Sequence, residues 1–283
     1  MSENGSPSLA QTQQVPVVRV SRERVERQTD VVAVEEPLEV RLHDRPFAVI
    51  MRTPGEDRAL AAGFLLAEGI IASAQELGAV EHCRHPDHPE EHNVVNAFLL
   101  GEARAHLDER LAGRRNVMTS ASCGMCGRLT IESLQTRAQA LALTTHVSPA
   151  FVQDLPDRLR TQQRIFDQTG GLHAAALFTV PGDLAATAED VGRHNAVDKV
   201  VGAMLFEDRL PLLGHVLVVS GRTSFEIVQK AWLAGIELVC AVSAPSSLAI
   251  ELAQTAGITL IGFAREQGFT IYSHPERVDG MGS

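Results

Sequence analysis

The sequence predicts an α/β protein with an α+β N-terminal part and a C-terminal domain built on a mostly parallel sheet. In the C-terminal half, short apolar runs at 216–219 and 238–242 alternate with helical patterns at 224–234 and 245–256. The N-terminal half instead contains runs such as 38–42, where apolar and polar residues alternate as in half-buried strands. Strand–helix alternation favours parallel strands, because each helix returns the chain to the edge where the previous strand began.

The composition limits the class of protein. The chain has 283 residues, of which 45% are hydrophobic and only 4% aromatic, so we expect mainly aliphatic cores in two domains. The net charge of −10 argues against a nucleic-acid-binding protein, which needs a basic surface. There is no apolar run long enough for a membrane span and no export signal, so no membrane association is expected. Four cysteines in such a chain indicate a cytoplasmic protein with reduced thiols.

The N-terminal part is expected to be a disordered tail followed by an α+β domain. Residues 1–14 are rich in Ser, Gln and Asn and offer little to bury, so we predict disorder there. The domain is predicted over 15–145. Leu60, Gly63 and Phe64 lie at helical spacing after acidic residues, in a helix that ends near Gly69. The other elements predicted for this domain are strands at 38–42, 47–51 and 93–100 and a helix at 107–115.

Residues 82–92 are dense in the residue types that bind metals, with histidines, a cysteine and acidic side chains close together. A zinc site is one interpretation of this stretch. Two prolines and the high charge fit a solvated hairpin loop better, and we favour the loop.

The centre of the chain contains its most reactive pattern, SCGMCG at residues 122–127. Cys123 and Cys126 are separated by two residues, glycines follow both, and arginines lie at 114, 115 and 128. The thiolate is the reactive form of cysteine, and nearby positive charge lowers the thiol pKa. Half of a zinc site, a redox dithiol and a sulfur-relay cysteine that carries a persulfide all fit this pattern. The CxxC spacing alone does not choose among them.

The second domain is predicted over 146–283. Ser148 and Pro149 are suited to the start of a helix, which is expected to end at the glycine pair 170–171. The elements predicted after it are strands at 172–180, 184–189, 216–219 and 238–242, helices at 192–206, 224–234 and 245–256, and two closing strands at 260–263 and 269–272.

Three of the predicted strand-to-helix loops have residues suited to anions. Helix N-termini with free N–H groups, small hydroxyl residues and arginines bind phosphate well, and loops after parallel strands share one sheet edge. We therefore predict a phosphate-bearing ligand at this edge. The loop residues assigned to it are Gly192, Arg193, His194 and Asn195 in the first loop and Ser220, Gly221, Arg222 and Ser224 in the second, with 243–247 as the third loop.

Two common classes of α/β protein do not fit these loops. The sequence lacks both GxGxxG and GxxxxGK[ST], so ordinary dinucleotide and nucleoside-triphosphate sites are not supported. A zinc deaminase needs H-x-E followed by P-C-x-x-C. Here Ala175 stands where the glutamate would follow His173, and the CxxC comes before the histidine. Deaminase chemistry is therefore disfavoured.

Taken together, the motifs resemble those of the formate dehydrogenase accessory sulfurtransferases, the FdhD family. The stretch EDVGRHNAVDK and its order relative to the cysteine pair are the most specific part of the resemblance. The matching stretches are RTPGED at 52–57, GFL at 63–65, EGI at 68–70, SCGMCG at 122–127, TGGLHAA at 169–175, EDVGRHNAVDK at 189–199, SGR at 220–222 and SAP at 243–245.

The resemblance implies a cytoplasmic, homodimeric sulfur carrier whose C-terminal domain has a three-layer, cytidine-deaminase-like fold. Such a protein takes persulfide sulfur from a cysteine desulfurase and passes it to the molybdenum bis(molybdopterin guanine dinucleotide) cofactor of formate dehydrogenase. The cofactor is then a bound substrate, and a guanine nucleotide should mimic it. The resemblance assigns the persulfide to Cys123, with Cys126 as the second thiol of the pair. It assigns cofactor binding to Phe263, Ala264, Arg265, Glu266, Gln267 and Gly268.

Two alternatives to the sulfurtransferase stay open at this point. One is a non-catalytic chaperone that only holds the cofactor, and the other is a zinc or redox protein built on the CxxC pair. No resident metal is expected with the first two functions.

Overall fold

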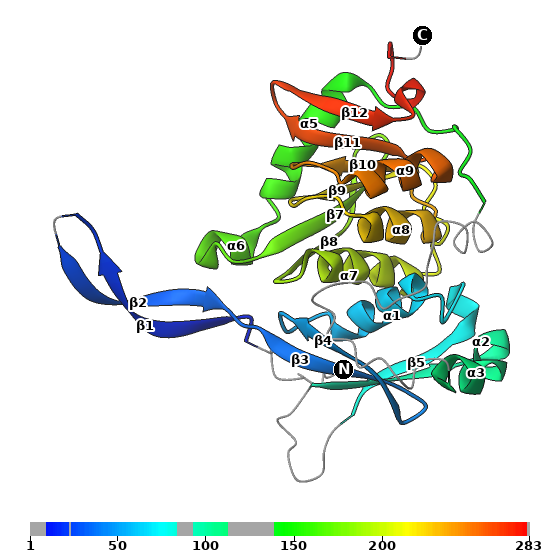
Figure 1. The fold of residues 1–283 in the computed structure, drawn as a ribbon, viewed down its shortest axis with the longest axis horizontal. Helices are drawn as coiled ribbons and strands as arrows, with labels where there is room; N and C mark the ends of the chain where they lie inside the picture. Colours follow the sequence, from blue (N-terminus) through cyan, green and yellow to red (C-terminus); the bar gives the residue numbers. More distant parts are fainter. Residues whose placement is uncertain (1–9, 23, 84–92, 113–138, 282–283) are drawn as a thin grey trace, which may run out of the picture.

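The computed structural model describes residues 10–22, 24–83, 93–112 and 139–281. It has two stacked domains and a two-stranded ribbon that projects away from both (Figure 1). None of the helices in these residues is both long and apolar enough to span a bilayer.

The N-terminal domain is a four-stranded sheet with the order β4-β3-β6-β5 and one face covered by helix α1. Leu38, Val40 and Leu42 alternate along β3 and are fully buried, which confirms the strand predicted from their spacing. The described elements are β3 (Glu36–Leu42), β4 (Arg45–Arg52), α1 (Asp57–Ala67), η1 (Ala74–Glu76), β5 (Leu77–His82), β6 (Val94–Leu99), α2 (Gly101–Ala105) and α3 (Leu107–Ala112).

The C-terminal domain has three layers around a six-stranded sheet with the order β12-β11-β10-β9-β7-β8. Helices α7, α8 and α9 cover one face and α5 covers the other (Figure 1). The elements are α5 (Pro149–Arg160), α6 (Arg164–Thr169), β7 (His173–Thr179), β8 (Leu184–Asp190), α7 (Arg193–Phe206), β9 (His215–Val219), α8 (Phe225–Leu233), β10 (Leu238–Ala241), α9 (Ser247–Ala256), β11 (Thr259–Arg265), β12 (Gly268–Ser273) and η2 (Pro275–Arg277).

The α/β class is confirmed, but the large sheet is mixed rather than mostly parallel. Only the β9–β10 and β10–β11 pairs are parallel, and β7–β8, β7–β9 and β11–β12 are antiparallel. The difference arises where two strands follow each other without a helix. Tight turns join β7 to β8 and β11 to β12, and such turns can connect only antiparallel neighbours.

Two expectations about local structure are corrected. Residues 12–14 were predicted to be disordered, but they begin strand β1 (Thr12–Val20), which pairs along its whole length with β2 (Val25–Ala33). The helix expected from Pro149 to the glycine pair is two helices, α5 and α6. The second helix starts because the carboxylate of Glu189 accepts hydrogen bonds from the backbone N–H groups of Ile165 and Phe166, both at 2.8 Å.

The segment before α5 is held by the C-terminal domain. Trp232 Nε1 donates to the carbonyl of Gln139 at 2.8 Å, and the hydroxyl of Thr144 donates to Glu237 at the same distance. The buried guanidinium of Arg277 donates to the carbonyl of Ala142 at 2.7 Å. Within the described part of this segment, residues 139–145 thus contact the C-terminal domain.

The two domains meet where the backbones of α1 and α7 touch. A Cβ atom on Gly63 would lie 2.0 Å from the carbonyl oxygen of Asp198, and one on Gly202 would lie 1.9 Å from that of Ala59. No side chain fits in either place, since real Cβ atoms do not approach this closely. These two glycines therefore set the distance between the helices.

We expect Gly202→Ala to lower the free energy of unfolding by about 1–3 kcal/mol, because the added methyl group must push α7 away from α1. Chemical denaturation of the full chain measures this change. Gly171→Ala is the matched control, since its Cβ would lie 3.7 Å from its nearest neighbour and should cost little. Equal midpoints for Gly202→Ala and the wild type would show that the helix contact is not tight.

Candidate functional site

The carboxyl ends of four strands lie at one edge of the large sheet. β9, β10 and β11 are parallel, and β8 runs in the same direction because both β8 and β9 are antiparallel to β7. The loops that follow these strands, together with the β11–β12 turn, therefore share this edge. All the loops predicted to bind the anionic ligand are brought together here.

A cavity of about 560 Å³ opens at this edge, between the sheet and the α5–α6 side. Ser220 and Arg265, both assigned from the sequence, line it, and so does His173. Val242, which follows β10, also lines it. The remaining lining residues come from α5, α6 and the adjoining loops: Pro156, Asp157, Leu159, Arg160, Gln163, Phe166, Gly170, Gly171 and Leu172. The volume lies within the range of small-molecule sites.

Arg193 is the first residue of α7 and is partly buried. Its Nε atom is buried, and no hydrogen-bond partner for it lies in the part of the chain that the structure describes. The two acids that precede the helix are engaged elsewhere, Glu189 at the start of α6 and Asp190 with Lys199. The guanidinium thus keeps its positive charge available at the edge, which fits an anion site.

The first turns of α7 and α8 are joined by a histidine. His194 Nε2 lies 2.9 Å from the hydroxyl of Ser224 and 3.1 Å from a carboxylate oxygen of Glu226. Burial, followed by the positive charges of Lys230 and Arg193, lowers the pKa of His194 to about 3, so the ring is neutral near pH 7. Burial also raises the pKa of Glu226. Ser224 is the N-cap residue of α8, yet its side chain makes no capping bond to that helix.

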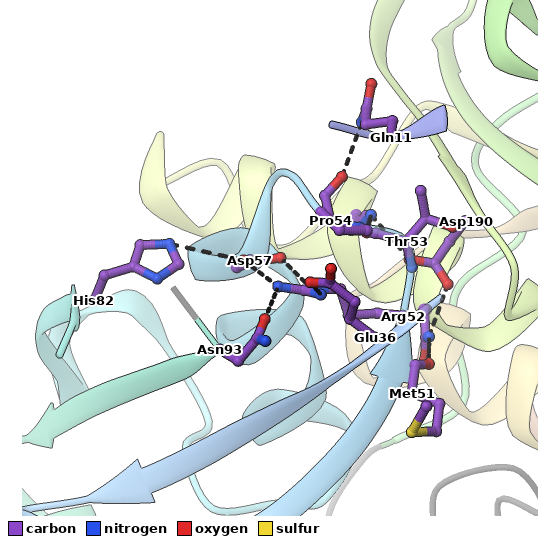
Figure 2. Close-up of polar contacts among 12 residues, drawn as sticks. Gln11, Glu36, Met51, Arg52, Thr53, Pro54, Asp57, His82, Asn93 and Asp190 are labelled. Carbon is purple, nitrogen blue, oxygen red and sulfur yellow. Dashed lines mark hydrogen bonds and ion pairs between the residues drawn. The ribbon is translucent and has the colours of Figure 1, made fainter. Parts of the chain in front are cut away.

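Asn195, predicted as a cofactor-binding residue, is buried and belongs to a clamp between the domains. Its amide donates to the carbonyl of Met51 and to the carboxylate of Asp190, both at 2.8 Å. Lys199 Nζ lies 2.9 Å from the same carboxylate and 2.9 Å from the carbonyl oxygen of Thr53. Asp190 and Thr53 are labelled where the clamp meets the loop after β4 (Figure 2). Asp190, Asn195 and Lys199 of the 189–199 motif therefore hold the two domains together.

A second charged cluster lies behind that loop. The fully buried guanidinium of Arg52 makes two hydrogen bonds to Asp57, at 2.8 and 3.0 Å, and others to Glu36 and Asn93 (Figure 2). Gln11 donates to the carbonyl of Pro54 from the start of the ribbon. The 52–57 motif therefore stabilises the domain contact rather than lining the cavity.

The last two predicted loops are only partly suited to a ligand. The hydroxyl of Ser246 accepts a hydrogen bond from the N–H of Ala249, so the third loop caps its own helix. In the β11–β12 hairpin, Ala264 is fully buried, Phe263 is exposed with φ 53°, and Glu266 and Gln267 are exposed at the turn.

Arg265 is the residue of that hairpin that reaches the cavity. Its Nη1 donates to the carbonyls of Val242 and Ala264 at 2.5 and 2.7 Å, which places the guanidinium at the cavity wall. Gly221 and Arg222 follow β9 at the same edge, and Arg222 is exposed. A Cβ on Gly221 would lie 3.2 Å from His173 Nδ1, so the glycine leaves room for that ring.

Comparison with known proteins now identifies the family. The profile of the FdhD/NarQ family matches residues 33–279. The chain belongs to this family.

The same comparison gives close relatives over nearly the whole chain. "Sulfur carrier protein FdhD" of Streptomyces coelicolor is 47% identical over 272 residues, covering 94% of this chain and 95% of the relative. The protein of the same name from Anaeromyxobacter dehalogenans strain 2CP-1 is 48% identical over 258 residues, covering 88% of each chain. A crystal structure described as a putative formate dehydrogenase accessory protein from Desulfotalea psychrophila has the same fold, with a TM-score of 0.74, 24% identity and coverage of 95% and 100%.

The cysteine pair of this FdhD/NarQ chain, Cys123 and Cys126, lies outside the described residues, and so does most of the 82–92 loop. The two described cysteines are poor nucleophiles. Burial raises the pKa of Cys240 to about 12, and burial also raises that of Cys83. Among the described residues, no cluster of three or more His, Cys, Asp or Glu side chains could hold a metal ion.

Some residues of the cavity were not found by sequence reasoning. His173 was noted only as part of a motif, and the half-buried ring proves to line the cavity, with a pKa lowered by burial and by Arg193. Gln163 and the α5–α6 wall carried no motif at all. Gln163 and the α5–α6 residues line the cavity only because α5 packs across this face of the sheet, which no local sequence pattern indicates.

We expect the neutral His194 to make the protein sensitive to acid. In the unfolded chain the His194 imidazole has its ordinary pKa of 6.5, whereas in the folded protein that pKa is about 3. Between these two pH values only the unfolded state binds the proton, so the free energy of unfolding decreases as the pH falls from 6.5 to 3. The slope contributed by one such group approaches about 1.4 kcal/mol per pH unit. Urea unfolding between pH 7 and pH 4 should show a shallower slope for His194→Gln than for the wild type.

Exposed His106 provides the control for this measurement, and His106→Gln should leave the slope unchanged. A wild-type slope in His194→Gln would mean that His194 accepts its proton in the folded state.

Proposed function

We propose that this protein is a sulfur carrier for the maturation of formate dehydrogenase. It accepts persulfide sulfur from a cysteine desulfurase and transfers it to the molybdenum bis(molybdopterin guanine dinucleotide) cofactor. The observation that carries the proposal is membership of the FdhD/NarQ family over residues 33–279, with relatives named sulfur carrier proteins at 47–48% identity. Cytoplasmic location is part of the same proposal.

The first chemical step is a transfer of sulfane sulfur to a thiolate. The thiolate of Cys123 attacks the terminal sulfur of the donor's cysteine persulfide. A new S–S bond forms on Cys123 while the old one breaks, and the donor's cysteine leaves as a thiolate, so the exchange involves no net oxidation. The arginines at 114, 115 and 128 favour the thiolate form that this attack requires. Cys126 is the second thiol of the same motif.

The cofactor is the substrate that receives the sulfur, and the strand-carboxyl edge is where we propose that it binds. Arg193, Arg222 and Arg265 supply positive charge there, and the start of α8 lacks a side-chain cap. These groups suit the pyrophosphates of the cofactor. The cavity beside them can hold a planar ring.

We expect Cys123→Ala to abolish both sulfur loading and cofactor sulfuration, because the proposal places the persulfide on Cys123 and leaves Cys126 as an assisting thiol. Intact-mass spectrometry after incubation with a cysteine desulfurase and cysteine should show a gain of one sulfur in the wild type, mapped to Cys123 by peptide analysis. Cys83→Ala is the matched control and should load normally.

A chaperone that only holds the cofactor would retain cofactor sulfuration in Cys123→Ala, and that result would overturn the carrier function. Zinc in the purified protein at one equivalent, lost together with Cys123, would instead favour a structural metal site.

We also propose that a second copy of the chain covers the ribbon β1–β2. Val20 pairs with Val25, so both side chains share one face with Val18, and the three are 71%, 68% and 57% exposed. A two-stranded ribbon is barely stable alone in water, and an exposed apolar face favours association. Residues 12–33 hold four arginines against three acidic residues, while the whole chain carries −10. The ribbon is thus electrostatically suited to the acidic body of another copy.

Light scattering coupled to size-exclusion chromatography should therefore give a dimer mass for the wild type. We expect the double change Val20→Ser and Val25→Ser to shift the protein to the monomer by removing this apolar face. Val49→Ser, at another exposed valine on β4, should stay dimeric. A monomeric wild type, or a dimer that survives both ribbon changes, would exclude this interface.

A further inference from the structure

Residues 139–147, here called the strap, lead from the part of the chain that contains the cysteine pair to helix α5. In Figure 1 the strap is the green trace that runs to α5 at the side of α8 and α9. It forms no helix or strand apart from a bridge between Val147 and Val278. Most of its side chains are exposed, and Leu143 is 42% exposed. So little apolar burial does not hold a segment in place, and polar contacts must do so.

Three buried residues of the C-terminal domain supply these polar contacts. They are Trp232, Glu237 and Arg277, which are 2%, 0% and 0% exposed. The indole of Trp232 donates to the carbonyl of Gln139 at 2.8 Å, at the start of the strap. The guanidinium of Arg277 donates to the carbonyl of Ala142 at 2.7 Å. The exposed strap is thus fastened to side chains that the surrounding packing keeps in place.

Glu237 is the centre of these contacts. One of its carboxylate oxygens accepts from the hydroxyl of Thr144 at 2.8 Å, and the other accepts from the hydroxyl of Thr145. The N–H of Gly214 donates to the second oxygen at 2.9 Å, and Arg277 lies 3.8 Å from the first. Burial would raise the pKa of Glu237, but these hydrogen bonds and the charge of Arg277 hold it below its usual value. A buried charge is costly unless it is hydrogen-bonded, so the carboxylate also depends on the strap.

The strap runs along the amino ends of the strands. Gly214 directly precedes β9, and Glu237 directly precedes β10. The N–H of Leu141 donates to the carbonyl of Ala256 at 2.8 Å, at the end of α9. A Cβ atom on Gly257 would lie 2.5 Å from the carbonyl oxygen of Leu141, so the strap and the helix end touch through their backbones. The strap is therefore held at the opposite edge of the sheet from the cavity.

This attachment limits where the cysteine motif can lie. Cys126 stands thirteen residues before Gln139, so it lies at most about 45 Å from the first attached residue, whatever path the chain takes. If the strap were released as far as Val147, the same limit would be about 75 Å. The contacts of the strap thus remove a large part of the space that the motif could otherwise occupy.

We propose that the strap is the anchor that sets the reach of the Cys123–Cys126 motif, and that Glu237 is its positioning residue, acting through Thr144 and Thr145. The anchor serves delivery of sulfur rather than loading. A desulfurase is a separate molecule that can approach the motif wherever it lies, whereas the proposed acceptor is bound on this chain at a set distance from the strap. A tethered group meets a bound acceptor most often when the tether matches the span between them. The inference rests on the proposed function and specifies which contacts support it.

Two double variants test the role of Glu237 in the full chain. Thr144→Val with Thr145→Val removes both hydroxyls and keeps the shape of the side chains. Thr144→Ser with Thr145→Ser keeps both hydroxyls and should therefore behave as the wild type. Thr255→Val is the matched control, because the hydroxyl of Thr255 donates to the carbonyl of Glu251 within α9.

The valine variant should release the strap without affecting loading. We expect its amide hydrogens at 139–147 to exchange at least about tenfold faster, since two hydrogen bonds to a charged group are lost. Sulfur loading of Cys123 by a cysteine desulfurase and cysteine should match the wild type. The loaded variant should lose its sulfur to saturating cofactor at least about threefold more slowly, because the anchored tether has lengthened. Intact-mass spectrometry follows both the gain and the loss of one sulfur.

Trp232→Phe provides a second release of the strap that leaves Glu237 untouched. Phenylalanine keeps an apolar ring in the core but cannot donate to Gln139, so the start of the strap should exchange faster and delivery should slow in the same way. This variant decides the outcome if the double valine change prevents folding, which circular dichroism would reveal.

Equal delivery rates for the valine and serine variants would overturn the proposal, and so would strap exchange that is unchanged in the valine variant. Loading that falls together with delivery would also overturn it, because the strap would then not act on delivery alone. The carrier function is tested separately by the wild type. If wild-type Cys123 never takes up sulfur, the carrier function fails and the anchor fails with it. If the wild type loads and delivers sulfur while the valine variant does both equally well, only the anchor fails.

Discussion

The backbone contact between α1 and α7 is the constraint on which the arrangement of both domains depends. Gly63 and Gly202 let the two helices touch without side chains between them. This contact brings the loop after β4 against the start of α7, where the fully buried side chains of Lys199 and Asp190 meet Thr53. Buried charges are costly unless they are paired and hydrogen-bonded, and here each is satisfied by groups from both domains. The N-terminal domain and the strand-carboxyl edge are thereby held in one fixed relation.

The 189–199 motif divides its residues between two tasks. Asp190, Asn195 and Lys199 turn inward and hold the domains together. Arg193 and His194, at the first turn of α7, stay near the edge with the start of α8. One helical turn thus carries both the support and the functional surface, because residues three and four apart share a face while their neighbours do not. A change at an inward position would alter the edge without touching a ligand.

Two buried polar atoms without partners lie at the edge where we propose that the ligand binds. Most buried polar atoms in proteins are hydrogen-bonded, so exceptions need an explanation. In the described part of the chain, Arg193 Nε at the start of α7 and Thr223 Oγ1 just before α8 are unpaired and lie at the strand-carboxyl edge, while Arg277 Nε is unpaired in η2. Gln163, which is 5% exposed, lines the cavity at the same edge. The polar groups of the third loop, in contrast, are used by the helix that follows, as the bond from Ala249 to Ser246 shows.

The sequence by itself determined most of the elements, the α/β class and the resemblance to the family, since periodicity, N-cap residues and motif order are local properties. Ser148 capping α5 and the alternation of Leu38, Val40 and Leu42 in β3 are examples. It also placed the anion loops in series, though not the roles of their members. Only the tertiary structure decided that Asn195 serves the domain contact, that Ala264 is buried, and that Gln163 and His173 line the cavity. Those outcomes depend on contacts between residues far apart in the chain, and residue type and spacing do not encode such contacts.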